Sequence, residues 1–371
     1  MRKKLALAAA GLGLGLAGRE FLMRKREPSL TAQVALITGG SRGLGYALSQ
    51  EVARQGCRLA ICARDDQELE RARINLEKQG AEVLTVQCDV ADKTQVDHLI
   101  EEVTHHYNGI DILINNAGII TAGPISTMTL QDFEEAMAVM FWGTVYPTMA
   151  ALPQMRRRRS GRIVNITSIG GKVAMPHLLP YSSAKFAAVG FSEGLRAELI
   201  KDGISVITIC PGLMRTGSYL NAQVKGQHEK EFTLFSLLDN LPLASISAES
   251  ATRRIVQAIK RNESEVVLSV PAKVQALFHG IFPGATANLL GLANRFLPTA
   301  DGTVLDTNQP DSDATSPVEG HIIQQELQSP LLNVATGLGL AAAERLNQPS
   351  IPHTHSPNGH GATEQNPEDG D

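Results

Sequence analysis

Short, mainly apolar runs alternate with amphipathic stretches from residue 33 to residue 268. Such runs are typical of parallel strands buried on both faces, and the stretches between them repeat apolar positions at helical spacing. The pattern predicts strands at residues 33–38, 58–62, 82–88, 110–114, 162–166, 204–209 and 265–268. It predicts helices at residues 46–55, 67–79, 96–107, 130–155 (interrupted), 182–201 and 248–261. Strictly alternating strands and helices indicate an α/β protein with a parallel sheet.

Composition separates the two ends of the chain from this alternating core. The 371 residues are 43% hydrophobic and 19% charged, as in a globular protein, and the net charge of −4 argues against a nucleic-acid binder. Residues 301–371 hold eleven acidic residues and one basic residue, a net charge of −10, so residues 1–300 carry +6. We expect one folded domain at residues 31–270, an amphipathic helical extension at 271–300 and a mostly disordered tail at 301–371. A helix is predicted within that tail, at residues 331–346.

Residues 1–30 combine basic clusters with one apolar run at residues 5–18. The run is too short to cross a bilayer upright as a helix. It fits a tilted or interfacial membrane anchor, a cleavable signal peptide or a disordered extension. The four cysteines lie in or beside apolar runs without metal-ligand spacing, so we expect buried thiols, a reducing compartment and no metal.

A glycine-rich turn follows the first predicted strand and opens the first predicted helix. It reads Thr38-Gly39-Gly40-Ser41-Arg42-Gly43-Leu44-Gly45. Glycines at 39, 43 and 45 permit a tight turn and the close approach of a pyrophosphate, which the N–H groups of a helix N-terminus bind. Because the turn stands between a buried strand and a helix, we interpret it as a dinucleotide-binding turn.

Tyr181 and Lys185 form a second pattern, and Ser168 lies thirteen residues before the tyrosine. Residues four apart share a face of a helix. An ammonium beside a phenol favours the phenolate, so we expect Lys185 to lower the pKa of Tyr181 from its usual value of about 10. Such a tyrosine can exchange a proton with an alcohol or carbonyl oxygen, and the Ser168 hydroxyl can hydrogen-bond the same oxygen.

Together these motifs resemble the short-chain dehydrogenase/reductase family over residues 31–270. The resemblance rests on the Gly-x-x-x-Gly-x-Gly turn, on Ser168, on Tyr181 with Lys185, and on the segment Asn115-Asn116-Ala117-Gly118. It implies a doubly wound parallel sheet, the Rossmann fold, and a nicotinamide cofactor. It also implies an enzyme that interconverts a ketone or aldehyde with an alcohol, and a homodimer or homotetramer.

The resemblance further implies a set of site residues. Ser168, Tyr181 and Lys185 are its catalytic residues, and Tyr181 and Lys185 also contact the cofactor. Asp89 and Val90 match the pair that meets the adenine ring, and Pro211, Gly212 and Thr216 match the segment at the nicotinamide carboxamide. The other expected cofactor-binding residues are Gly39, Ser41, Arg42, Gly43, Leu44, Gly45, Arg64, Asn116, Ala117 and Gly118.

The end of the second predicted strand bears on the choice between NADP and NAD. An NAD enzyme carries an acid there that binds the ribose 2′-OH, and in our register that position is Ala63. Arg64 follows it, and Arg42 lies in the glycine-rich turn, so two guanidinium groups could hold a 2′-phosphate. The sequence therefore favours NADP. A register shift of two residues would place Asp65 at this position and favour NAD instead.

One position departs from the family pattern. Met140-Phe141-Trp142-Gly143 stands where the family usually has Asn-x-x-Gly, and that Asn helps to hold a water that links the lysine to solvent. A thioether donates no hydrogen bond. Either the proton relay runs through backbone carbonyls and water, or the protein has drifted from rapid catalysis. Because Ser168, Tyr181 and Lys185 remain, we favour a working enzyme.

Substrate choice is expected to depend on residues 213–244, which include several large apolar side chains. They indicate either a lid over an apolar substrate or helices that pack on their own core. His177 either touches substrate or is an ordinary loop residue. Apolar stripes at residues 274–282 and 289–297 predict helices that pack on the domain, on a second subunit or against a membrane.

The sequence thus predicts an NADP-dependent oxidoreductase for a small, apolar or lipid-like carbonyl or alcohol substrate. We expect it at a membrane with its catalytic domain on the cytoplasmic side, or else in the cytoplasm. Two alternatives stay open: a non-catalytic NADP-binding sensor or scaffold at a membrane, and a soluble reductase of acyl-carrier thioesters.

Overall fold

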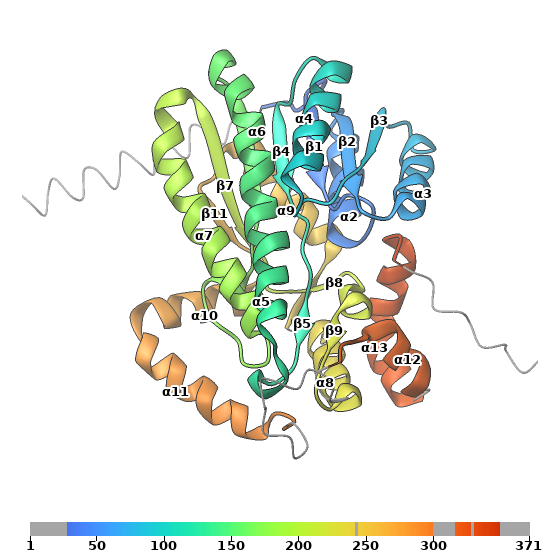
Figure 1. The fold of residues 1–371 in the computed structure, drawn as a ribbon, viewed down its shortest axis with the longest axis vertical. Coiled ribbons are helices and arrows are strands. Elements are labelled where there is room, and N and C mark those ends of the chain that lie inside the picture. The colour runs from blue at the N-terminus through green and yellow to red at the C-terminus, as the bar shows by residue number, and fades with distance from the viewer. Residues whose placement is uncertain (1–27, 242–243, 300–315, 328–329, 349–371) are drawn as a thin grey trace, which may run out of the picture.

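The centre of the molecule is one open sheet of seven parallel strands (Figure 1). The computed structural model describes residues 28–241, 244–299, 316–327 and 330–348. In chain order the strands are β1 (Val34–Thr38), β2 (Arg58–Ala63), β3 (Val83–Gln87), β4 (Ile112–Asn115), β6 (Gly161–Ile166), β7 (Ile204–Cys210) and β11 (Glu265–Val267). In space they run β11-β7-β6-β4-β1-β2-β3, so the predicted α/β class and doubly wound sheet are confirmed.

Helices cover both faces of this sheet, as the alternating sequence pattern requires. Side chains from successive strand positions, such as Leu36 and Ile37 of β1, point into two separate buried clusters. One face packs against α2 (Gly43–Arg54), α3 (Asp66–Glu77) and α9 (Ala248–Arg261). The other packs against α4 (Lys93–Tyr107), α6 (Gly143–Arg158) and α7 (Leu179–Leu199). The protein therefore has two cores with the sheet between them.

The helix predicted at residues 130–155 is interrupted, as expected. It consists of α5 (Leu130–Ala136), a π-helical segment (Met137–Trp142) and α6. The hydroxyl of Thr144 donates to the carbonyl oxygen of Met140 at 2.9 Å within this break. π-Helical segments occur frequently at functional sites, and this one packs against α7, which carries Tyr181 and Lys185.

The chain reverses its direction of winding between β1 and β4. From β1 the sheet grows to one side through β2 and β3, and to the other through β4, β6 and β7. In doubly wound sheets, ligands bind at the carboxyl ends of the strands beside such a switch point. The turns after β1, β4 and β6, which carry most of the motifs, all leave the sheet at that edge.

Two small sheets, three α-helices and a 3₁₀ turn form a second layer beyond that edge among the described residues. The sheets are β8 (Leu213–Arg215) with β10 (Ser245–Ser247), and β12 (Val318–Glu319) with β9 (Gln223–Val224) and β5 (Thr121–Ala122). The helices are α8 (His228–Asn240), α12 (Gly320–Leu327), α13 (Pro330–Arg345) and a 3₁₀ turn (Ser218–Asn221). They enclose a third apolar cluster, which includes Tyr219, Phe232 and Ile323.

This third cluster bears on two expectations from the sequence. Part of the acidic tail is folded, because α12 and α13 pack on α8 and Ile323 and Ala343 are buried there. The helix predicted at residues 331–346 is confirmed by α13. The rest of that tail lies outside the described residues. Among the apolar side chains of residues 213–244, Tyr219, Leu220 and Phe232 are buried in this cluster. Their burial supports the prediction of helices that pack on their own core over that of a lid.

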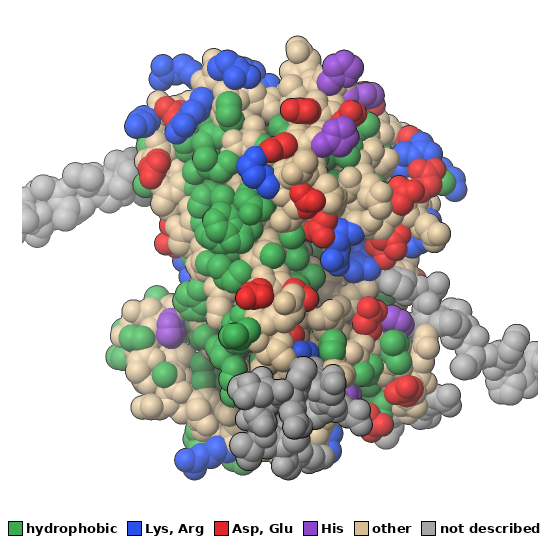
Figure 2. All heavy atoms as spheres, viewed as in Figure 1, with side chains coloured by type: hydrophobic (Ala, Val, Ile, Leu, Met, Phe, Trp, Pro, Cys, Tyr) green, Lys and Arg blue, Asp and Glu red, His purple; other side chains and the backbone are tan. Residues whose placement is uncertain are grey.

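A helical hairpin leaves the domain after β11. It consists of α10 (Val270–Ile281) and α11 (Pro283–Ala293), and it lies at the periphery of the molecule in Figure 1, with Ala272 of α10 packed against Ile169 and Val173. Figure 2 shows apolar side chains gathered over α6 and α7, with more on this hairpin. No helix in the described ranges is long and apolar enough to cross a membrane. Residues 1–27, where we expect an anchor, signal peptide or extension, lie outside the described residues.

Candidate active site

Ser168, Tyr181 and Lys185 converge at the carboxyl edge of the sheet. Ser168 follows β6, and the other two lie one turn apart near the start of α7. The side chains of Ser168 and Tyr181 are hydrogen-bonded, and the Ser168 Oγ also accepts from the N–H of Gly170 at 2.9 Å. The Lys185 Nζ lies 5.8 Å from the centre of the Tyr181 ring. The three predicted catalytic side chains thus form one cluster.

Burial dominates the ionisation of this cluster. Desolvation raises the pKa of Tyr181, a hydrogen bond from Ser168 lowers it, and the nearby Asp239 carboxylate raises it. Burial also lowers the pKa of Lys185 to about 8. The expectation that Lys185 lowers the pKa of Tyr181 is therefore wrong for the protein alone. The ammonium lies over the ring, and its Nζ donates to the Ile166 carbonyl oxygen at 3.0 Å.

Met140 lies beside the lysine, where the family has an asparagine. Its side chain is 1% exposed. A Cβ placed on Gly118 would be 3.8 Å from the Lys185 Nζ, 3.7 Å from the Met140 Cγ and 3.8 Å from its Sδ. A thioether cannot donate to a water at this point. The Ile166 carbonyl oxygen accepts one of the three hydrogen bonds that the Lys185 ammonium can donate. A proton relay from Lys185 to solvent would have to use the other two.

The glycine-rich turn has the geometry that a dinucleotide requires. Gly39 and Gly43 take left-handed φ angles of 63° and 56°. A Cβ on Gly45 would lie 2.0 Å from the Gly39 carbonyl oxygen, so this position admits no side chain. The N-terminus of α2 has no side-chain cap among the described residues, and the positive end of its dipole lies at this turn. The residues present therefore fit the pyrophosphate of a nicotinamide dinucleotide.

Asn116 connects this turn to the end of β4. Its Nδ2 donates to the carbonyl oxygens of Thr38 at 3.0 Å and Gly39 at 3.1 Å. Ala117 and Gly118 follow it toward Lys185, and the Ala117 N–H donates to the Thr38 Oγ1 at 3.2 Å. The segment after β4 thus fixes the shape of the turn after β1.

The end of β2, where we expect the adenosine ribose, is surrounded by both basic and acidic side chains. β2 ends at Ala63, and Arg64 follows it as an exposed residue, as our register required. Asp65 begins α3, and its Oδ1 accepts from the Glu68 N–H at 2.8 Å. Arg42 forms a 2.7 Å ion pair with Glu68, whose carboxylate also accepts from Ser41 at 3.3 Å. Sequence reasoning missed Glu68, which has no motif around it.

The predicted adenine and carboxamide contacts lie on opposite sides of the glycine-rich turn. Asp89 and Val90 follow β3, and Val90 is buried. Pro211 and Gly212 follow β7, and the Pro211 carbonyl oxygen accepts from the Ile169 N–H at 2.7 Å. Thr216 follows β8 and is 3% exposed. The residues predicted from the family resemblance thus surround one edge of the sheet.

Two further side chains in this layer have clear positions. His177 is held by Glu231 of α8, with 2.7 Å between the Nδ1 and the carboxylate, which favours a structural role over contact with substrate.

Asp239 of α8 is 4% exposed, and burial raises its pKa to about 7. Its Oδ2 has no hydrogen-bond partner among the described residues. Nothing in the sequence marks this residue, because its importance comes only from its proximity to Tyr181.

Comparisons with known proteins agree with this architecture. A family model for short chain dehydrogenases matches residues 33–225. A dehydrogenase/reductase SDR family protein 7-like from Anopheles gambiae is 36% identical over 71% of this chain and 83% of its own length. The putative oxidoreductase SadH of Mycobacterium tuberculosis is 32% identical over 73% of this chain and 99% of its own. The solved L-sorbose reductase of Gluconobacter frateurii, complexed with NADPH and L-sorbose, is 27% identical with a TM-score of 0.59, over 66% of this chain and 97% of its own.

The doubly wound sheet and its glycine-rich turn define an NAD(P)-dependent dehydrogenase or reductase. Within that class, the chain belongs to the short-chain dehydrogenase/reductase family.

Proposed function

We propose that this protein is an NADP-dependent oxidoreductase that interconverts a ketone or aldehyde with an alcohol. The observation that carries the proposal is the cluster of Ser168, Tyr181 and Lys185 beside the glycine-rich turn. The deciding experiment is consumption of NADPH across a panel of hydrophobic ketones, with Tyr181→Phe as the control. Cofactor binding without turnover on any of them would favour the non-catalytic sensor instead.

The roles of the three side chains follow from their surroundings. When bound, the nicotinamide cofactor supplies or accepts the hydride. Tyr181 donates its proton to the substrate oxygen, and Ser168 hydrogen-bonds the same oxygen where negative charge develops. Lys185 binds the nicotinamide ribose and lies against the tyrosine ring. Burial raises the pKa of Tyr181, so the phenol holds the proton that reduction of a carbonyl consumes.

NADP is the proposed cofactor because the exposed Arg64 follows the end of β2, whereas Asp65 caps α3. Arg42 lies in the same region, where it pairs with Glu68. We expect a clear preference for NADPH over NADH in kcat/KM. Arg64→Ala removes one charge-assisted hydrogen bond and should raise KM for NADPH by roughly tenfold, with little change for NADH. Steady-state kinetics with both cofactors measure this.

Arg71→Ala is a matched control, because Arg71 is an exposed arginine on α3. It should leave both KM values unchanged. Equal use of the two cofactors by the unmodified protein, or an equal effect of Arg64→Ala on both, would contradict the NADP assignment.

The α10–α11 hairpin supports an apolar substrate taken from a membrane surface. It packs against Ile169 and Val173, immediately after Ser168. It exposes large apolar side chains, among them Val274 (61%), Leu277 (66%) and Ile281 (59%). Residues 269–299 include no acidic residue and two basic ones, Lys273 and Arg295. An apolar surface with cations and without carboxylates suits an anionic lipid surface.

The double variant Leu277→Asp/Ile281→Asp should therefore reduce co-sedimentation with vesicles that contain anionic lipid. Each carboxylate both removes apolar area and repels the headgroups. The matched control is Ile200→Asp, since Ile200 is 70% exposed at the end of α7, away from the hairpin. Sedimentation that is equal for the two proteins would contradict membrane docking through α10 and α11.

A homodimer or homotetramer completes the proposal. Trp142, Met149 and Phe186 are large apolar residues exposed on and around α6 and α7, and Figure 2 shows side chains of this kind gathered there. An exposed patch of large apolar side chains is typical of an interface.

A further inference from the structure

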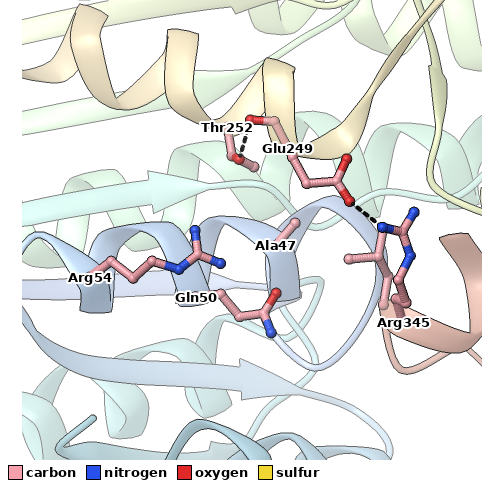
Figure 3. Close-up of a pocket in the computed structure, with 7 residues that line it drawn as sticks. Ala47, Gln50, Arg54, Glu249, Thr252 and Arg345 are labelled. Carbon is pink, nitrogen blue, oxygen red and sulfur yellow. Dashed lines mark hydrogen bonds and ion pairs between the residues drawn. The ribbon is translucent and has the colours of Figure 1, made fainter. Parts of the chain in front are cut away.

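The chain returns to the glycine-rich turn after its last described helix. α13 ends at Arg345, which pairs with Glu249 of α9 at 3.1 Å. Leu346 is 3% exposed and belongs to the main core with α2 and α9. Figure 3 shows the pocket between these helices, with Arg345 on one wall. Leu346 therefore anchors the two residues that follow, Asn347 and Gln348, which we call the latch.

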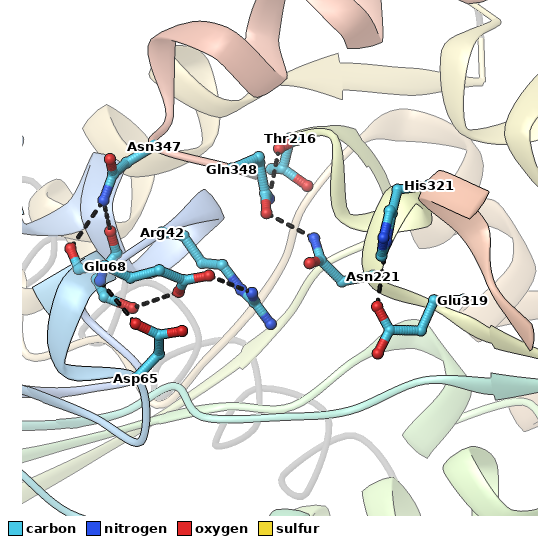
Figure 4. A network of polar contacts seen from close by, with 10 residues as sticks. Arg42, Asp65, Glu68, Thr216, Asn221, Glu319, His321, Asn347 and Gln348 are labelled. Atoms are coloured by element: carbon cyan, nitrogen blue, oxygen red, sulfur yellow. Dashed lines mark hydrogen bonds and ion pairs between the residues drawn. The ribbon is translucent and has the colours of Figure 1, made fainter. Parts of the chain in front are cut away.

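The latch is bonded to the glycine-rich turn itself. The Leu346 carbonyl oxygen accepts from the N–H of Gly43 at 2.8 Å. The Asn347 Nδ2 donates to the carbonyl oxygens of Ser41 at 2.7 Å and Glu68 at 3.0 Å (Figure 4). These contacts cover the adenosine side of the cofactor site, where Ser41 also bonds the Glu68 carboxylate.

The latch also reaches the opposite wall of the site. The Gln348 Nε2 donates to the carbonyl oxygen of Thr216 at 3.0 Å, and its Oε1 accepts from the Asn221 Nδ2 at 2.6 Å (Figure 4). Thr216 belongs to the segment proposed to hold the nicotinamide carboxamide. One glutamine side chain thus stands between the two walls that a bound dinucleotide would have to touch.

Gln348 occupies a particular place in that space. The second glycine of the turn, Gly43, lacks a side chain so that a pyrophosphate can approach its backbone. A Cβ on Gly43 would be 3.0 Å from the Gln348 Nε2, and outside its own turn no other described atom lies within 4 Å of that point. The amide of Gln348 therefore stands where the proposed function places the pyrophosphate.

We propose that the latch blocks the pyrophosphate position of the cofactor site, and that a dinucleotide binds only after Gln348 has swung away. This inference rests on the cofactor site of the proposed function. A dinucleotide that binds only the open form has its affinity reduced by the fraction of molecules that are open. Each of the two Gln348 side-chain hydrogen bonds favours closure about fivefold, as ordinary protein hydrogen bonds do, and both together about twentyfold.

The test is stopped-flow binding of NADPH to the full chain, followed by cofactor fluorescence without substrate. Gln348→Ala removes both bonds and empties the space, so the association rate should rise up to about twentyfold and Kd should fall in parallel. Asn221→Ala leaves the latch intact but removes one of its partners, so about a fivefold rise is expected. Arg345→Ala is the control, because it changes the same segment on the side away from the turn.

Thermal unfolding of each variant checks that the fold is kept. Association rates that match the unmodified protein would overturn the inference, as would weaker binding by Gln348→Ala, since Gln348 would then hold the cofactor instead of excluding it. A failure of every variant to bind NADPH or NADH would contradict the cofactor assignment itself. Because binding is measured without turnover, a failure of the latch inference can be distinguished from a failure of the cofactor assignment.

Discussion

Replacing Tyr181 with Phe is expected to abolish NADPH-dependent reduction of hydrophobic ketones by this protein. The ring and its packing under Lys185 are kept, and only the hydroxyl that donates the proton is lost. A positioned general acid contributes about 10²- to 10⁴-fold to a rate, so kcat should fall by at least two orders of magnitude. The measurement is the rate of NADPH consumption at saturating ketone.

Cofactor affinity separates this effect from a structural one. Tyr181→Phe should bind NADPH nearly as the unmodified protein does, because the glycine-rich turn and the residues around Arg64 are untouched. Full turnover by Tyr181→Phe would mean that another group supplies the proton. The buried Asp239 would then be the first group to examine, since its pKa is raised to about 7 and its charge acts on Tyr181.

The second large effect is expected from Gly45→Ala. The added Cβ would lie 2.0 Å from the Gly39 carbonyl oxygen and 2.5 Å from the Asn116 Nδ2, so the turn after β1 must move. Forcing one methyl group into packed backbone typically costs about 1–3 kcal/mol or more. We expect a loss of stability of about 3 kcal/mol in denaturant unfolding, together with weakened cofactor binding.

Gly190→Ala provides the comparison. Gly190 lies in α7, and a Cβ there would meet no atom of the described residues within 4 Å outside its own stretch of helix. Alanine favours a helix over glycine by up to about 1 kcal/mol, so this variant should be equally stable or more stable. If the two glycine variants had the same stability, the close contact at the turn would not be what requires glycine at position 45.

Local patterns predicted the central fold well, for identifiable physical reasons. Parallel strands buried on both faces leave continuous apolar runs, which is why β1 could be placed within one residue. The helix Ala248–Arg261 has its predicted bounds because the residues next to each end determine where it begins and ends. The Ser247 Oγ accepts from the Ser250 N–H at 3.2 Å, and Asn262 ends the helix with a left-handed φ of 51°.

Contacts between distant segments could not be predicted in this way. The ion pair of Arg42 with Glu68 and the position of Asp239 near Tyr181 depend on how helices pack, which no local pattern records. The helix α13 was predicted, but its packing on α8 was not. The same holds for Asn347 and Gln348, whose partners lie more than a hundred residues earlier in the chain.

The third apolar cluster also sets an order of events during synthesis. Tyr219 and Phe232 are buried partly by Ile323 and Ala343, which leave the ribosome about a hundred residues later. At about 5–20 residues per second, this leaves two aromatic side chains without their cover for roughly ten seconds. During that interval the nascent chain has a nearly complete central sheet next to an open apolar surface. The acidic tail therefore finishes the domain, and the emerging protein is most prone to aggregate just before that tail arrives.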